Sequence, residues 1–113
     1  MREGDIILTP MPQADGIVKN RPAIYIREMP PFQDALVCGV STQIHQLAPD
    51  FDELITSQDN DFSASGLISD SLIRLGFLAV LPRRIIIGSI GSISPERHKR
   101  LLHKLSKYLI KTP

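Results

Sequence analysis

An arginine followed by a proline, where a predicted strand begins, is the feature of this sequence best suited to chemistry. In the stretch VKNRPAIYI, Arg21 and Pro22 precede an apolar run. Proline fixes its own φ and pushes the preceding residue toward an extended conformation, so we expect Arg21 to be held in place. A guanidinium is permanently charged, and its planar fork matches phosphate oxygens and can stabilise charge that develops on phosphorus. The alternative is a surface salt bridge to one of the eleven acidic residues of positions 1–70.

The histidines and the single cysteine are further candidates. His45 is chemically suited to act as a general acid or base, although a histidine in a loop is more often a solvated surface residue. His98 and His103 lie five residues apart on a predicted helix and therefore on different faces, so the sequence predicts no metal site. Cys38 lies in an apolar strand pattern, where we expect a buried and unreactive thiol.

Charged residues are divided unevenly along the chain. Residues 1–70 contain four Lys/Arg and eleven Asp/Glu, whereas residues 71–113 contain nine and one, although the net charge is only +1. Clustered basic residues favour a polyanionic partner such as a nucleic acid. The composition gives equal support to a second interpretation, in which the acidic and basic segments meet in the fold or the basic tail is a solvated helix face.

The length and the apolar runs indicate the general class of protein. The 113 residues suffice for a core without disulfides or a structural metal, and we expect one domain over 1–113. The opening MREGD is too acidic for a secretory signal. The longest apolar run, residues 77–82, is too short to span a bilayer. We therefore expect a cytoplasmic protein with no membrane span and no cofactor.

Short apolar segments separated by turn residues predict a mainly β fold. The first strand is expected over 5–9, stopped by Pro10 and Pro12, and QADGIVKN supplies a loop. The next two strands are expected to pair as a hairpin. An acidic, partly irregular excursion follows over residues 48–66. The expected strands after the first are 22–27, 35–40, 67–75, 77–81 and 85–90, and FDELI at 51–55 could form one more.

The C-terminal part has a different pattern. Ser94 is a preferred N-cap, Pro95 suits the first helical position and Glu96 suits the positive end of the helix dipole, so a helix is predicted to begin here. One apolar stripe should pack on the sheet; it contains Leu101, Leu102, Leu105, Tyr108 and Leu109. A small twisted barrel or coiled antiparallel sheet closed by this helix is the expected architecture.

The glycines of GSIGSIS, residues 88–94, are not expected to cradle a phosphate. The segment lacks the Lys-Ser/Thr of a phosphate-binding loop. Gly88 and Gly91 are instead expected to mark a bulge or close packing.

Four segments, in order, resemble the PemK/MazF toxins. EGDIILTPMPQADGIVKNRPAIYI resembles their opening, and LVCGVSTQI resembles their third strand, which ends in Thr or Ser followed by Gln. SDSLIRL is similar to their Asp-Ser-Val strand, and IGSISPERHKRLLHKLSKYL to their closing turn and helix. The resemblance implies an SH3-like small barrel that forms homodimers. It also implies a toxin that cleaves single-stranded RNA without a metal and is neutralised by a cognate antitoxin.

The resemblance implies roles for individual residues. In such chemistry the 2′-hydroxyl attacks the adjacent phosphate, so the enzyme must remove that proton, neutralise the developing charge and protonate the leaving oxygen. Arg21 falls on the catalytic arginine of the family, and Ser41 falls on its catalytic Thr/Ser position. Alternatively, Ser41 bonds its own backbone, as serine often does. His45 is added on its chemistry alone. Substrate binding is expected from the flanking Lys19, Asn20, Thr42 and Gln43.

A second interpretation is a barrel of the same kind that binds an antitoxin-like partner or nucleic acid without cleaving it. Phe77 and Ala79 favour this interpretation, because family members often have a Gln and an Arg facing the RNA there. The first loop also lacks the Gly-Ser-Glu stretch that is usual in the family. A toxin that inhibits a topoisomerase has a precedent in a related fold, but no residue here argues for it.

Overall fold

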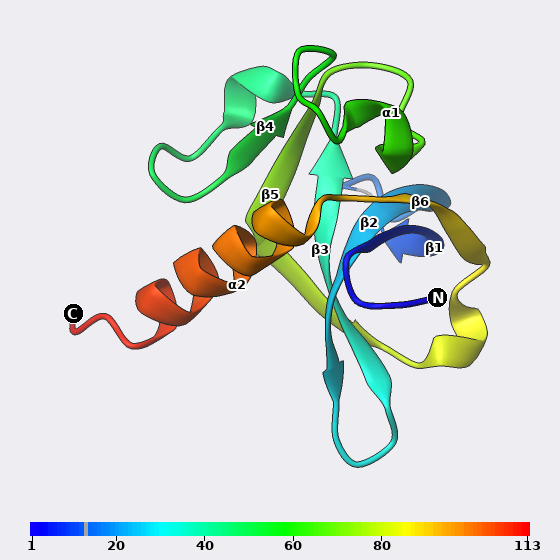
Figure 1. Cartoon of the computed structure of the whole chain (residues 1–113). Coiled ribbons are helices and arrows are strands. Elements are labelled where there is room, and N and C mark those ends of the chain that lie inside the picture. The colour runs from blue at the N-terminus through cyan, green and yellow to red at the C-terminus, as the bar shows by residue number, and fades with distance from the viewer. Residues whose placement is uncertain (13) are drawn as a thin grey trace.

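The fold is a curled antiparallel sheet with one long helix at its C-terminal end (Figure 1). The computed structural model describes residues 1–12 and 14–113. The strand order β4-β5-β3-β2-β1-β6 forms a half-barrel, so the predicted mainly β fold with a C-terminal helix is confirmed. The strands are β1 (Asp5–Pro12), β2 (Val18–Met29), β3 (Asp34–Ser41), β4 (Glu53–Ile55), β5 (Ser71–Leu81) and β6 (Gly88–Ser92).

The helical segments are short except for the last one. They are the 3-10 helix η1 (Ile44–Gln46), α1 (Phe62–Ser65), the 3-10 helix η2 (Arg83–Ile85) and α2 (Pro95–Leu109). Within the described part of the chain, no helix combines the length and the apolar character needed to cross a membrane.

Alternating residues build a core on each face of the sheet. The larger cluster includes Cys38 and Ile73, and Leu101 of α2 belongs to it. The smaller cluster on the other face centres on Tyr25 and Val37. Cys38 is fully buried, and this burial raises the pKa of its thiol to about 12. The predicted burial is confirmed, and the raised pKa disfavours the reactive thiolate.

Prolines lie inside the first two strands, whereas the sequence predicted that prolines would mark the ends of these strands. β1 continues through Pro10 to Pro12, because its pairing with β6 ends at Leu8 and a proline beyond that residue removes no hydrogen bond on that side. β2 begins at Val18, and its Pro22 pairs with β1. The predicted limits at 9 and 22 are therefore wrong, and residues 18–20 of the predicted first loop belong to β2.

A single strand, β5, replaces the two strands expected over 67–75 and 77–81. Its pairing with β3 jumps from Arg74 to Leu78 while β3 advances by one residue, so residues 75–77 form a bulge. The side chain of Asp52 supports this bulge, since its Oδ1 accepts the backbone N–H of Leu75 at 3.0 Å. In the sequence, the break in the alternation of apolar and polar residues looks like the end of one strand. In the structure this break is a bulge within one continuous strand.

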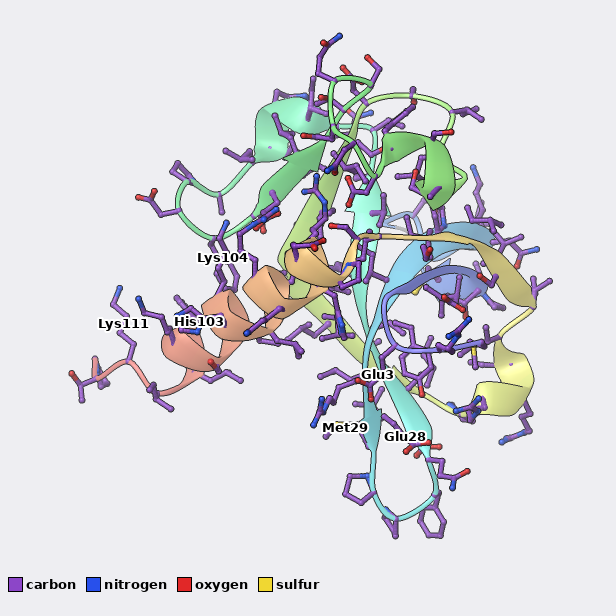
Figure 2. All side chains as sticks on the ribbon, in the orientation of Figure 1. Glu3, Glu28, Met29, His103, Lys104 and Lys111 are labelled. Carbon is purple, nitrogen blue, oxygen red and sulfur yellow. The ribbon has the colours of Figure 1, made fainter. Side chains whose placement is uncertain are left out.

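The acidic excursion packs against α2 through buried ion pairs. Arg97 Nε lies 2.8 Å from Asp61 Oδ2, and Arg97 Nη1 lies 2.9 Å from Glu53 Oε1, with all three side chains at most 8% exposed. Arg100 and Lys104 also contact Glu53, at 2.8 and 3.1 Å. Figure 2 shows Lys104 on the side of α2 that faces β4. The acidic and basic segments therefore meet in the fold, which is one of the alternatives that the composition left open.

The predicted helix is confirmed, but its apolar stripe is buried only in part. Ser94 Oγ accepts the backbone N–H of Arg97 at 3.1 Å, as expected of an N-cap. Leu101 and Leu105 are buried. Tyr108 is 57% exposed, and the residues after it are also exposed. Figure 1 shows why the prediction fails for this last turn: the C-terminal end of α2 extends away from the sheet.

The last strand lies later than predicted, because η2 occupies residues 83–85 and β6 begins at Gly88. The register between β6 and β1 shifts opposite Ile6 and Ile7, so Gly91 adjoins a bulge. A Cβ on Gly91 would collide with the backbone of Ser65 and Ala64. The expectation that these glycines mark a bulge or close packing is confirmed for Gly91. It is wrong for Gly88, where a Cβ would meet no described atom within 4 Å.

Candidate functional site

A pocket of about 560 Å³ opens at the edge where β2 begins and β3 ends. The first and second strands, β3, the segment after it and β5 all contribute to its wall. Among the described residues, its polar lining is Arg21, Ser41, Thr42, Gln43 and Arg74, and its apolar lining includes Met11, Pro22 and Phe77.

The strand register brings three of these polar side chains to one face of the sheet. Ala23 pairs with Gly39 across β2 and β3, and Gly39 pairs with Arg74 across β3 and β5. Side chains two residues apart on a strand share a face. Arg21 therefore shares the face of Ala23, and Ser41 shares that of Gly39. Three strands deliver two guanidinium groups and one hydroxyl to the same side.

Pro22 explains why a pocket forms at this point. The pairing of β2 with β3 stops at Ala23 and Gly39. Pro22, the next residue, has no N–H with which to extend the ladder. Beyond this pair the pocket lies between the two strands, with Arg21 and Ser41 in its wall. The proline thus opens the sheet within β2. The sequence had indicated that Pro22 marks the beginning of this strand, but the strand begins at Val18.

The hydroxyl of Ser41 is oriented by the chain that follows it. The backbone N–H of Gln43 donates to Ser41 Oγ at 3.0 Å. This is the local bond that the sequence offered as an alternative to a phosphate contact, but the two are compatible. An oxygen that accepts one bond keeps its proton for donation. Ser41 can therefore donate to an anionic oxygen in the pocket.

Arg74 and Phe77 both line the pocket and contact each other, and the sequence did not predict either residue as part of the site. The Cζ atom of Arg74 lies over the ring of Phe77, 5.6 Å from its centroid. Phe77 was noted only as a departure from the polar residue that the family often has. The charged residue inside the apolar stretch LIRLGF was the available signal, since a charge in a half-buried strand needs a partner or a function.

The other predicted site residues divide into two groups. Thr42 and Gln43 line the pocket. Lys19 and Asn20 are exposed residues of β2, opposite β1, and fall outside the described lining. His45 is exposed in η1, which follows directly after Gln43, and it too falls outside that lining.

The charge of the pocket suits an anion. Arg21 and Arg74 supply two permanent positive charges, and Ser41 and Thr42 supply hydroxyl donors. The described part of the lining contains no carboxylate. Groups of this kind, gathered on a concave surface, favour phosphate over a neutral or cationic ligand.

The comparison with known families decides what kind of protein this is. The family described as PemK-like, MazF-like toxin of type II toxin-antitoxin system matches residues 2–109. The chain belongs to this family. The resemblance noted in the sequence is confirmed, and the curled half-barrel is consistent with the PemK/MazF fold. Membership supports a toxin function and implies an antitoxin partner. No curated protein sequence matches this PemK/MazF chain.

Proposed function

We propose that this PemK/MazF-family chain is an endoribonuclease toxin that cleaves single-stranded RNA without a metal ion and is neutralised by a cognate antitoxin. The observation that supports cleavage most directly is that Arg21 and Ser41 line one pocket and share one face of the sheet. These are the two positions at which the family resemblance implies catalysis. Residues 1–113 are proposed to act as one domain.

The reaction needs a bond to form and a bond to break at one phosphorus atom. The 2′-oxygen of the ribose attacks the adjacent phosphate and loses its proton. The bond to the 5′-oxygen breaks, and that oxygen takes up a proton. The products are a 2′,3′-cyclic phosphate and a 5′-hydroxyl. Negative charge increases on the non-bridging oxygens in the transition state, and donors aimed at these oxygens accelerate the step.

Arg21 and Ser41 can supply these donors. The guanidinium of Arg21 neutralises the developing charge with a planar pair of N–H groups. The hydroxyl of Ser41 donates to a phosphate oxygen while the N–H of Gln43 fixes its orientation. Arg74 adds a second positive charge to the same pocket. Because these groups are held by β-strands, little reorganisation is needed when the charge develops.

Substitution of Arg21 tests the proposal. Purified protein is incubated with long single-stranded RNA in EDTA, and the cleaved ends are analysed for cyclic phosphate. We expect Arg21→Ala to lower the cleavage rate by about 100- to 1,000-fold, the range for loss of one charge-stabilising donor. Arg84→Ala is the control, since Arg84 is exposed in η2 and outside the described lining. Intact cleavage by Arg21→Ala, or no cleavage by folded wild type, contradicts the proposal. The second of these results favours the non-catalytic interpretation.

Proton transfer by His45 is a subsidiary part of the proposal. His45 lies two residues after Gln43, in η1, and an imidazole suits this task near neutral pH. We expect His45→Gln to lower the cleavage rate and to reduce the dependence of that rate on pH, because a glutamine side chain cannot act as a general acid or base. An unchanged pH profile removes His45 from the mechanism and leaves the roles of Arg21 and Ser41 intact.

The proposed partners are RNA, an antitoxin and a second copy of the chain, in the cytoplasm. Exposed apolar side chains at two separate places support protein–protein contacts: Leu78 and Val80 on β5, and Leu109 and Ile110 at the end of α2. Exposed apolar side chains of this kind can form part of an interface. Sedimentation equilibrium measures the mass, and a monomer at micromolar concentration contradicts the homodimer.

A further inference from the structure

Phe77 is an aromatic side chain in a pocket that otherwise suits phosphate. It lines the pocket together with Arg21 and Ser41, and it is 36% exposed. A phosphate gains nothing from a phenyl ring, since the ring offers no donor and no charge. The ring therefore points to a second part of the ligand, one with an apolar face.

The ring is held in place from several sides. A Cβ on Gly39 would lie 3.1 Å from Phe77 Cδ1, so glycine leaves the room that the ring uses. Arg74 lies over the ring at a distance typical of a cation–π contact. The bulge at residues 75–77 sets the direction of Phe77, and Asp52 supports this bulge through the N–H of Leu75. The position of the ring is thus built into the sheet.

We propose that Arg74 and Phe77 form a platform on which a nucleobase of single-stranded RNA stacks, beside the phosphate position at Arg21 and Ser41. This inference rests on the proposed function and extends it from the phosphodiester to the base. Bases stack on aromatic rings and on guanidinium planes, and this pair of side chains presents both together. The pocket, at about 560 Å³, lies within the roughly 300–1,000 Å³ range of ligand pockets.

A platform of this kind selects single strands. In a duplex the faces of each base are covered by its neighbours, so a base must leave the stack before it can bind the platform. Stacking also tolerates any base, because every base has a π face. The platform therefore adds affinity for unpaired RNA in the same pocket that Arg21 lines.

Binding of a 2′-O-methyl RNA hexamer tests the platform independently of cleavage, because this RNA lacks the attacking hydroxyl. Phe77→Leu keeps an apolar side chain but removes the ring, and we expect it to weaken binding roughly tenfold, as loss of one base–aromatic stack does. Phe77→Trp should retain binding. Phe32→Leu is the matched control, since Phe32 is 79% exposed at the turn between β2 and β3, and it should bind as wild type does.

The Phe77→Trp variant gives a second measurement. The chain contains no tryptophan, so the new indole is the single tryptophan fluorophore. We expect the hexamer to quench its fluorescence. Inorganic polyphosphate and an abasic oligomer of equal charge should not, because they offer phosphates without bases. Equal quenching by polyphosphate, or wild-type affinity in Phe77→Leu, overturns the inference.

Gly39 provides a test of the ring position. We expect Gly39→Ala to displace the ring and to weaken binding of the hexamer several-fold, in line with the loss of part of one stack. In the Phe77→Leu background the same change should have little further effect, because the ring is already gone. Additive losses would mean that Gly39 acts on binding by another route, and they count against the platform.

The outcomes separate this inference from the function on which it rests. If wild type cleaves RNA, Arg21→Ala does not, and Phe77→Leu binds as wild type, the proposed function stands and the platform fails. If base-dependent binding is intact but folded wild type does not cleave, the proposed catalysis fails and the platform stands as part of a binding protein.

Discussion

At the scale of single residues, Arg97 is the side chain on which the packing of α2 most depends. It is 5% exposed and bonds both Asp61 and Glu53, themselves nearly buried. We expect Arg97→Ala to lower the free energy of unfolding by about 3–5 kcal/mol, because it leaves the buried carboxylate of Asp61 without its charged partner and removes one of the cations that contact Glu53. Urea denaturation measures the loss. Urea is uncharged and does not screen the remaining ion pairs, as a denaturing salt would.

Arg27 offers the matched control for this prediction. Its side chain is 59% exposed and lies 3.4 Å from Glu3, which Figure 2 shows near the base of the β2–β3 hairpin. An exposed pair contributes at most about 1 kcal/mol, so Arg27→Ala should have a small effect. Equal losses in Arg27→Ala and Arg97→Ala would show that burial does not decide the cost.

The sequence predicted those residues of the site that lie in recognisable local patterns, and it missed those that depend on distant contacts. Arg21 is marked by the adjacent proline, and Ser41 by the end of an apolar strand. Phe77 reaches the pocket through a bulge that a carboxylate 23 residues away from Leu75 supports, and Arg74 reaches it through its pairing with Gly39 of β3. Arg97 lies outside the predicted apolar stripe of the helix, and the sequence did not reveal its burial, because its partners lie 36 and 44 residues earlier in the chain.

At the scale of elements, the contact between α1 and β6 leaves no room for a side chain. A Cβ on Gly91 would overlap the backbone of Ser65 and Ala64 in α1. We expect Gly91→Ala to destabilise the fold by about 1–3 kcal/mol, the usual cost of overpacking, because backbone on both sides must shift. The shift in thermal unfolding temperature measures it.

Gly88 belongs to the same strand and receives the same substitution as a control. A Cβ there would meet no described atom within 4 Å, so Gly88→Ala should leave the unfolding temperature nearly unchanged. A comparable shift in both variants would mean that the loss of glycine itself, and not the contact with α1, determines the effect. The sequence marked both glycines as special, but only the tertiary contact distinguishes them.

At the scale of the whole molecule, ion pairs join the acidic segment of the chain to the basic segment. The near-zero net charge comes from segments that meet between α2 and the excursion, at Arg97, Arg100 and Lys104 on one side and Glu53 and Asp61 on the other. Some of the basic residues that could have bound a polyanionic partner thus form ion pairs within the protein. The pocket for an anion draws on Arg21 from the acidic segment and on Arg74 from the basic segment.

This network predicts that the protein loses stability in acid. Burial alone would raise the pKa of Glu53, but hydrogen bonds and charge from Arg100 and Lys104 outweigh it and leave that pKa below its ordinary value of 4.5. Burial also raises the pKa of Asp61, and the bonds from Arg97 and Ser94 bring it below 3.8. A carboxyl with a lowered folded pKa binds fewer protons when folded. Its stabilisation is complete above the unfolded pKa and is lost as the pH falls through the folded pKa.

We therefore expect the free energy of unfolding in urea to be steady near neutrality and to fall steadily below about pH 4.5, where these carboxyls begin to take up protons. Asp61→Asn removes one of the two titrating groups. This variant should be less stable than wild type at pH 7, because Arg97 loses a charged partner, but the difference should shrink toward pH 3. Parallel profiles for the two proteins would mean that Asp61 does not contribute to the acid sensitivity, since the gap depends on pH only if the substituted group titrates differently in the folded and unfolded states.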